Sequence, residues 1–180
     1  SRLIRGARDH INLESYIIED DAMGTAFADL LLAQQARGVQ VNVIYDSVGA
    51  LSTAPAFFAR LRAGGVAVLE FNPVNPLLAR APWELNSRDH RKLLVVDGQV
   101  AFVGGVNISS VYASGSVVRR PGRRAEQPAT PGAGAPAPVW RDTHLRVAGP
   151  VVAEFQRLFL QTWDKQRGPP LAVRNYFPVL

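Results

Sequence analysis

The sequence predicts an α/β domain in which a βαβαβ unit is followed by a hairpin and a further strand. Three runs rich in β-branched and aromatic residues, 11–18, 39–45 and 66–71, have the composition of strands. The stretches between them have the apolar spacing of helices, and Asp97-Gly98 stands between two apolar runs as in a tight hairpin. Because strands that alternate with helices usually pair in parallel, we expect a mixed, mostly parallel sheet with helices on both faces.

Two helices are expected between these strands, and each has start and stop signals. The first begins after Asp20 or Asp21, which can cap its amino terminus, and it stops at Gly38. The second begins at Pro55 and stops at Gly64. The order of elements up to residue 71 is therefore βαβαβ.

Residues 1–168 are expected to form a single domain, because 180 residues with 47% hydrophobic content can bury one sizeable core. Segment 113–139 is rich in proline, glycine, alanine and arginine and lacks apolar periodicity, which predicts a disordered insertion. An alternating strand at 140–147 and an amphipathic helix follow it. The tail at 169–180 has the composition of a linker toward a second domain.

The turn at 97–98 predicts the register of the hairpin. If these two residues form the whole loop, Lys92 lies opposite Val103 and His90 lies opposite Gly105. Side chains alternate along a strand, so His90 and Lys92 share one face.

Three functional side chains are expected to gather on that face, namely His90, Lys92 and Asn107. Gly105 leaves room between them for a ligand, whereas Asp97 points toward the other face.

This combination suits an anionic tetrahedral group better than a metal ion. The ammonium of Lys92 can only donate hydrogen bonds and repels cations, and the chain has no cysteine, so no metal or other cofactor is expected. The imidazole of His90 can attack phosphorus or carry a proton, while Lys92 and Asn107 can stabilise charge on phosphoryl oxygens. The hairpin therefore predicts phosphoryl transfer.

The same stretch resembles the HxKxxxxD motif of the phospholipase D superfamily, followed by its G-[S/G]-x-N motif. The matching residues are His90, Lys92, Asp97, Gly104, Gly105 and Asn107. Within the superfamily the chain is most similar to the amino-terminal half of bacterial cardiolipin synthases. Further matches are Glu14-Ser15-Tyr16, Arg37-Gly38-Val39, Arg88-Asp89, Ile108 and Trp140-Arg141-Asp142-Thr143-His144.

The resemblance implies a phospholipase D-like fold and transphosphatidylation, in which two phosphatidylglycerols give cardiolipin and glycerol without a metal. It implies that His90 is the nucleophile or its acid/base counterpart, that Lys92 and Asn107 bind the phosphate, and that Asp142 holds the histidine. Such a carboxylate would fix the tautomer of His90 and stabilise a phosphohistidine.

Secondary roles are expected for five more residues. Arg88, Gly105 and His144 are candidates for substrate binding, His144 because it shares a strand face with Asp142. Asp97 and Gly104 belong to the motif but are assigned structural roles.

One motif supplies only half of such a site. In-line displacement at phosphorus places the nucleophile and the leaving group on opposite sides, so a second motif has to protonate the leaving group. A further domain of the same protein or a homodimer could supply it, and the tail at 169–180 favours the further domain.

The net charge of +5 favours anionic partners such as phospholipid headgroups or nucleic acid without choosing between them. The resemblance implies phosphatidylglycerol and an anionic membrane surface ahead of nucleic acid. No apolar run approaches the roughly 18 residues of a spanning helix, so peripheral association, on the cytoplasmic membrane, is expected. Two alternatives stay open. The same residues could serve a phosphodiesterase that hydrolyses lipid or nucleic acid, or this half alone could be an inactive membrane-binding module.

Overall fold

The computed structural model describes residues 2–79, 88–110 and 142–179, so the insertion expected at 113–139 lies outside the described residues. The helices are α1 (Arg2–Arg5), α2 (Ala22–Ala36), α3 (Pro55–Ala63) and α5 (Val152–Lys165), with a 3-10 turn η1 at Pro76–Leu78. The strands are β1 (His10–Ser15), β2 (Gln40–Asp46), β3 (Ala67–Phe71), β4 (Lys92–Val96), β5 (Val100–Gly104) and β6 (His144–Ala148).

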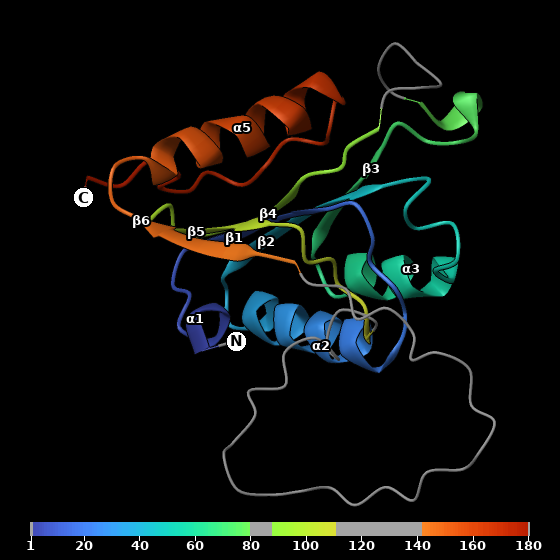
Figure 1. The fold of residues 1–180 in the computed structure, drawn as a ribbon, viewed down its shortest axis with the longest axis horizontal. Coiled ribbons are helices and arrows are strands. Elements are labelled where there is room, and N and C mark those ends of the chain that lie inside the picture. Colours follow the sequence, from blue (N-terminus) through green and yellow to red (C-terminus); the bar gives the residue numbers. More distant parts are fainter. Residues whose placement is uncertain (1, 80–87, 111–141, 180) are drawn as a thin grey trace, which may run out of the picture.

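These strands form one sheet in the order β3-β2-β1-β4-β5-β6 (Figure 1). The mixed sheet and the βαβαβ order are confirmed, but the expectation of a mostly parallel sheet needs correction. Within the described residues, β1–β2 and β2–β3 are parallel, whereas β1–β4, β4–β5 and β5–β6 are antiparallel. The reason is that the hairpin enters beside β1 and runs against it, and β6 then returns along the outer edge of the hairpin.

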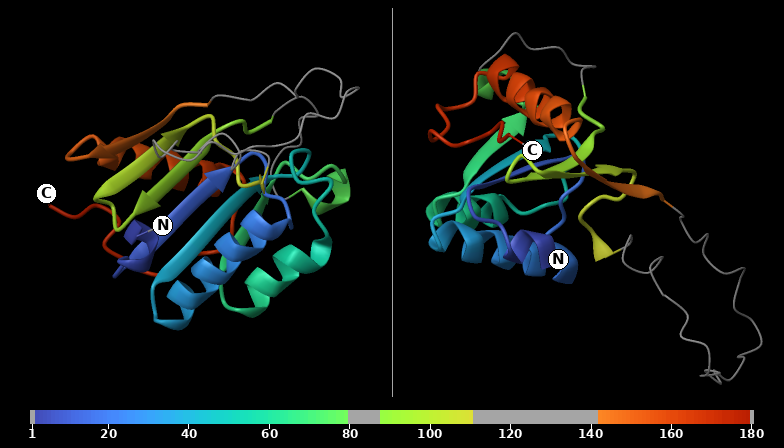
Figure 2. Two further views of the ribbon diagram at one scale, coloured as in Figure 1. Left: turned by 60° about the horizontal axis from the view of Figure 1, so that its bottom comes forward. Right: turned by 90° about the vertical axis from the view of Figure 1, so that its left-hand side faces the viewer.

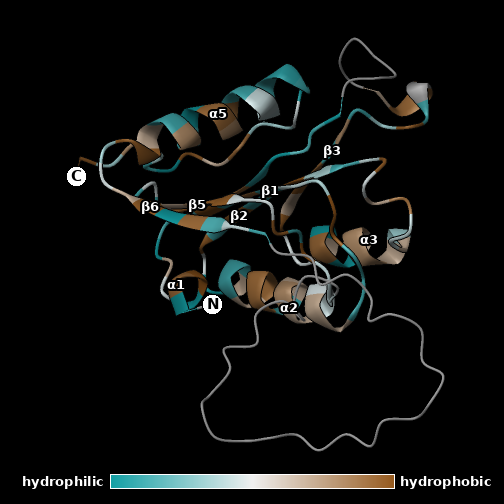
Figure 3. Cartoon of the chain, viewed as in Figure 1, coloured by the Kyte–Doolittle hydropathy of each residue, from teal (hydrophilic) through white to brown (hydrophobic). Residues whose placement is uncertain are grey.

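Helices cover both faces of this sheet, as the sequence predicts. Helices α2 and α3 lie on one face and α5 lies on the other (Figure 2). Each face has its own apolar cluster: Ile11, Val41 and Leu31 belong to the first, and Val95 and Phe159 to the second. Apolar and polar residues alternate along α5 (Figure 3), so that helix presents one apolar side to the sheet.

The start of α2 agrees with the sequence signal, because Asp21 Oδ1 accepts a hydrogen bond of 2.8 Å from Gly24 N. Helix α3 begins at Pro55, also as expected.

The turn between β4 and β5 has the predicted conformation but a different register. Asp97 and Gly98 have φ angles of 53° and 65°, and Gln99 N donates to Val96 O over 3.0 Å, as in a primed turn. Val96 nevertheless pairs with Val100 rather than with Gln99, so one extra residue bulges at the start of β5.

The predicted pairs are therefore wrong by one position. Val103 lies opposite Leu93 instead of Lys92, and His90 precedes β4, so it has no partner at Gly105. If the β4–β5 pairing is continued by one residue beyond Leu93 and Val103, Lys92 lies opposite Gly104.

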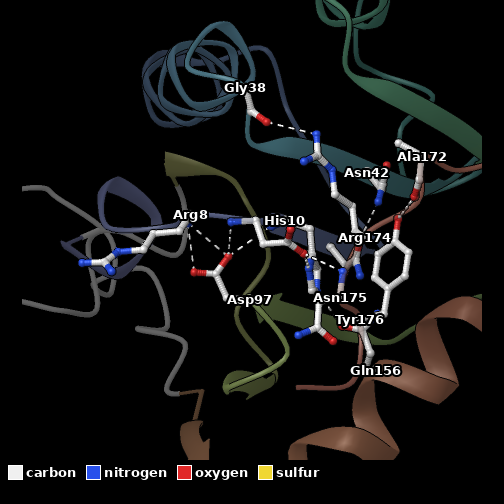
Figure 4. A network of polar contacts seen from close by, with 12 residues as sticks. Arg8, His10, Gly38, Asn42, Asp97, Gln156, Ala172, Arg174, Asn175 and Tyr176 are labelled. Atoms are coloured by element: carbon white, nitrogen blue, oxygen red, sulfur yellow. Dashed lines mark hydrogen bonds and ion pairs between the residues drawn. The ribbon is translucent and has the colours of Figure 1, made fainter. Parts of the chain in front are cut away.

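The tail after α5 packs back against the domain. The indole of Trp163 donates to Pro169 O over 2.8 Å, and the Tyr176 ring meets the buried His10 ring edge-on with centroids 4.7 Å apart. Arg174 donates to Gly38 O over 3.1 Å (Figure 4). A connection from this tail to a second domain stays a prediction.

Candidate active site

Four strands contribute to one row of residues at the end of the sheet where β1 finishes and β4 begins. Lys92 pairs with Ser15 of β1, and Gly104 pairs with His144 of β6. Neighbours in such a row point to the same face. Lys92 and His144 therefore come together from strands that are distant in sequence.

Tyr16, the residue that follows β1, contacts the two leading catalytic candidates. Its ring stacks on the exposed imidazole of His90, with centroids 4.0 Å apart and planes tilted by 21°. The ammonium of Lys92 lies over the same ring, 5.2 Å from its centroid, and donates to the backbone oxygen of His90 over 2.8 Å. Tyr16 thus brings His90 and Lys92 together.

Asn107 is held by the segment after β1. Its Oδ1 accepts a hydrogen bond of 3.2 Å from Ile17 N, and Ile108 N donates to Ile17 O over 3.2 Å. The side chain of Asn107 is buried. The backbone amide of Ile17 already donates to Asn107 Oδ1. The side-chain NH₂ group of Asn107 is therefore the one that can donate to a phosphate oxygen.

Gly105 makes room for a protein side chain and not, as the sequence suggested, for a ligand. A Cβ on Gly105 would lie 2.5 Å from Asp142 Oδ1, so the carboxylate of Asp142 already occupies that space. Gly104 is equally constrained, because a Cβ there would lie 2.2 Å from Thr143 O. The two glycines let the residues before β6 pass close to the end of β5.

Asp142 acts electrostatically on Lys92. Partial burial lowers the pKa of Lys92 below its usual value, while the negative charges of Asp142 and Asp89 raise that pKa and offset part of the effect. Between the described side chains of Asp142 and His90 there is no hydrogen bond, so the expected carboxylate–imidazole contact is absent from this conformation. The imidazole contacts Tyr16 instead.

Lys92, Asn107 and His144 line one hollow of about 220 Å³ between β4 and α2. Partial burial lowers the pKa of His144 below its usual value, although part of its side chain is exposed. Among the described residues, no group of three or more histidines and carboxylates is placed to hold a metal ion.

Comparisons with known proteins agree with this geometry. Residues 1–115 match the family model described as "Cardiolipin synthase, PLD-like domain". The chain belongs to this family of phospholipase D-like domains. It is 36% identical over 174 residues to a cardiolipin synthase of Alkalihalophilus pseudofirmus, covering 96% of this chain and 30% of that protein. It is 35% identical over 177 residues to cardiolipin synthase A of Pseudomonas putida, covering 97% and 33%. The chain thus spans about a third of the length of these relatives.

Solved structures support the fold of the phospholipase D-like domain. The phospholipase D family member Nuc of Salmonella typhimurium superposes with a TM-score of 0.57 at 16% identity, covering 91% of this chain and 84% of that one. A polyphosphate kinase of Porphyromonas gingivalis gives a TM-score of 0.55 at 15% identity, covering 96% and 24%. At these identities the likeness concerns the fold alone.

The motif aspartate of this phospholipase D-like domain lies at the opposite end of β4 from His90. Asp97 Oδ1 accepts hydrogen bonds from the backbone amides of Asp9 and His10 over 2.9 and 3.1 Å, and Oδ2 accepts one from Arg8 N over 3.0 Å (Figure 4). The carboxylate thus ties the β4–β5 turn to the start of β1 and contacts none of the phosphate-binding candidates.

A polar network behind His90 anchors the residues on both sides of it, and sequence reasoning missed this network. Asp89 N donates to Asp46 Oδ2 over 2.9 Å, and Asp89 Oδ1 accepts from Arg91 Nε over 2.8 Å. Arg91 Nη2 also lies 2.9 Å from Oε1 of the buried Glu14. Arg88, expected to bind substrate, donates to the backbone of Asn72 over 2.9 Å.

Burial and the neighbouring Asp89 raise the pKa of Glu14 to about 9, so its carboxyl group is protonated at neutral pH. The pKa of Asp89 is lowered, because the Glu14 and Arg91 side chains donate to its carboxylate. One arginine and one proton thus neutralise two buried carboxyl groups. The charged residues on both sides of His90 in the motif Arg88-Asp89-His90-Arg91 were a sequence signal for this network. Their partners on β1 and β2 can be recognised only from the fold.

Proposed function

We propose that this chain supplies one half of the active site of a phosphatidyltransferase of the cardiolipin synthase type. The observation that carries the proposal is that His90 and Lys92 meet at the ring of Tyr16, while Lys92 and Asn107 line one hollow at the same end of the sheet. Membership of the cardiolipin synthase family supports the same reaction.

The proposed reaction has two displacements at phosphorus. In the first, an imidazole nitrogen of His90 attacks the phosphorus of phosphatidylglycerol, a P–N bond forms, and the P–O bond to the headgroup glycerol breaks. The departing glycerol oxygen takes its proton from an acid on the opposite side. In the second, the hydroxyl of another phosphatidylglycerol attacks the phosphorus of the phosphohistidine and gives its proton to the group that protonated the glycerol. A new P–O bond forms and the P–N bond breaks.

Lys92 and Asn107 would hold the equatorial oxygens during both steps. The ammonium of Lys92 compensates their negative charge, and the amide NH₂ of Asn107 donates a hydrogen bond. Asp142 would support the positive charge of Lys92. The stack on Tyr16 would orient His90 for the attack, and only after the phosphohistidine has formed would the imidazole turn to donate a hydrogen bond to Asp142.

The acid on the opposite side would come from a second phospholipase D-like half. A further domain reached through the tail beyond residue 168 is favoured over a homodimer, because this chain matches about a third of each relative's length. His144 would line the phosphate site, whereas Gly105 would make room for Asp142. Arg88, Gly104 and Asp97 would serve the framework.

The lipid substrate would be reached from the membrane surface. Within the described residues no helix is long and apolar enough to cross a membrane. The net charge of +5 supports attraction to an anionic surface such as that of the cytoplasmic membrane.

Acceptor choice tests this proposal. The assembled enzyme is incubated with vesicles of phosphatidylglycerol labelled in the headgroup glycerol, and free glycerol and cardiolipin are quantified. Equal amounts of the two products are expected. Phosphatidic acid without cardiolipin would indicate a hydrolytic phosphodiesterase, acid-soluble nucleotides released from DNA would indicate a nuclease, and vesicle binding without turnover would indicate an inactive half.

The control is His90→Ala, which should abolish both products and lower the unfolding midpoint only slightly, because the side chain of His90 is exposed and loses only its stack on Tyr16.

A further inference from the structure

The hollow beside Lys92 has walls of two kinds. Lys92, Asn107 and His144 give it a polar side, where the phosphate would bind. The remaining wall is largely apolar, and its hydrophobic residues are Leu13, Leu93 and Leu94 from the sheet, Met23 and Phe27 from α2, and Val106 and Ile108 from the segment after β5.

The apolar wall is an open margin of the hydrophobic core. Phe27, Leu94 and Ile108 pack against the core cluster but are only partly buried. Met23, on the first turn of α2, is 42% exposed. Apolar surface thus remains accessible directly beside groups that bind an anion.

We propose that this hollow binds the glycerol-ester region and the first methylenes of one acyl chain of the phosphatidyl donor, next to the phosphate on Lys92 and Asn107. The inference rests on the proposed function and adds to it the place where the donor's apolar part is recognised. A phosphodiester with a hydrocarbon neighbour matches both walls at once.

The size of the hollow limits how much of the lipid enters. A half-open hollow of about 220 Å³ is small beside a whole diacyl lipid, so it takes the ester region and a few carbons of one chain. The rest of the chain would stay in the bilayer.

A nucleotide would fit this wall poorly. Its sugar oxygens and the polar edge of its base would face Met23, Phe27 and Leu94, where they would lose water without gaining hydrogen-bond partners. The hollow therefore favours a lipid over a nucleic acid as the donor.

Chain length provides the first test. The kcat/KM of the assembled enzyme is measured with diacylphosphatidylglycerols from dipropionyl to dioctanoyl, each below its micelle concentration, and with the acyl-free diester glycerophosphoglycerol. The value should rise about fourfold for each of the first few methylenes and then level off, because burying a methylene contributes about 0.8 kcal/mol. A flat series would overturn the inference.

Substitution of Met23 provides the second test. Met23→Gln keeps the length and charge of the side chain but makes it polar, and it should lower kcat/KM for the dihexanoyl lipid about fivefold while leaving glycerophosphoglycerol within twofold. Met23→Leu should retain activity. The matched control is Val151→Gln, because Val151 is 50% exposed at the start of α5 on the other face of the sheet.

The outcomes separate the two proposals. Equal losses on both substrates, or no loss on the lipid, would overturn the acyl site while the transferase stands. Failure of the unmodified enzyme to act on any phosphodiester would refute the proposed function itself. Independently of turnover, a phosphatidylglycerol with a diazirine on an early acyl carbon should crosslink to α2 in the His90→Ala variant, and crosslinking elsewhere only would contradict the site.

Discussion

The imidazole of His90 lies against the phenol ring of Tyr16, with ring centroids 4.0 Å apart. The ammonium of Lys92 lies over the same phenol ring, 5.2 Å from its centroid. Tyr16 follows β1, whereas His90 precedes β4, so the contact depends on the antiparallel pairing of these two strands. One aromatic side chain thus positions both residues that are proposed to act on the phosphate.

Removal of the Tyr16 ring should slow the reaction more than removal of its hydroxyl. A stacked ring pair contributes about 0.5–1.5 kcal/mol, so we expect Tyr16→Ala to lower kcat about 2- to 10-fold. Tyr16→Phe keeps the stack and should stay within twofold of the unmodified enzyme. Steady-state transfer assays check this expectation, and equal losses in the two variants would show that the hydroxyl matters instead of the ring.

The pH profile should report the charge of Lys92. Burial lowers the pKa of Lys92 and Asp142 raises it, so Asp142→Asn removes a charge that keeps the ammonium protonated. The alkaline limb of the kcat/KM profile should therefore move to lower pH in Asp142→Asn. An unmoved limb would mean that Asp142 does not act on Lys92. Lys92→Arg, which stays protonated, should lose that limb while retaining part of the activity.

Stability should depend on pH through Glu14. Its pKa is raised to about 9 in the folded state from an ordinary value of 4.5, so its stabilising contribution is complete below pH 4.5 and is lost as the pH rises toward 9. Glu14→Gln cannot titrate. As the pH rises from 5 to 9, the free energy of unfolding of Glu14→Gln should therefore increase relative to that of the unmodified chain. The difference should grow by up to about 1.4 kcal/mol per pH unit.

Urea unfolding at pH 6, 7 and 8 measures this difference. The exposed Glu154→Gln is the control and should show the same pH dependence as the unmodified chain. A Glu14→Gln variant with that same dependence would contradict the assignment.

Substitutions of Asp97 and Asp142 should have opposite effects on stability and on catalysis. Asp97→Ala removes the acceptor for three backbone amides near Arg8 and His10, and we expect it to lower the free energy of unfolding by about 2–3 kcal/mol with kcat within twofold at low temperature. Asp142→Ala changes an exposed position, so it should lower kcat and leave the free energy of unfolding nearly unchanged. Urea unfolding and transfer assays on both variants decide the matter, and a loss of kcat in a folded Asp97→Ala would place that residue in the chemistry.

Local signals in the sequence predicted much of the fold. Asp21 caps α2, Pro55 starts α3, and Asp97-Gly98 forms the primed turn, because each of these depends on the backbone preferences of a few adjacent residues.

Long-range contacts explain what the sequence could not predict. The one-residue shift of the hairpin accompanies the packing of Gly98 on the tail, where a Cβ would lie 2.7 Å from Tyr176 O. The contact of Tyr16 with His90 and the contact of Glu14 with Arg91 require β1 to lie beside β4. Asp142 could be named from the motif, but its place over Gly105 depends on how the chain enters β6.

The central claim is that His90 forms the covalent intermediate. The assembled enzyme is mixed with phosphatidylglycerol, quenched with alkali within milliseconds and digested, and the peptide containing His90 is analysed by mass spectrometry. A phosphatidyl group on His90 that disappears when a second phosphatidylglycerol is allowed to react is the predicted result. An unmodified His90 in an enzyme that is turning over, with the phosphatidyl group on another residue, would contradict the account.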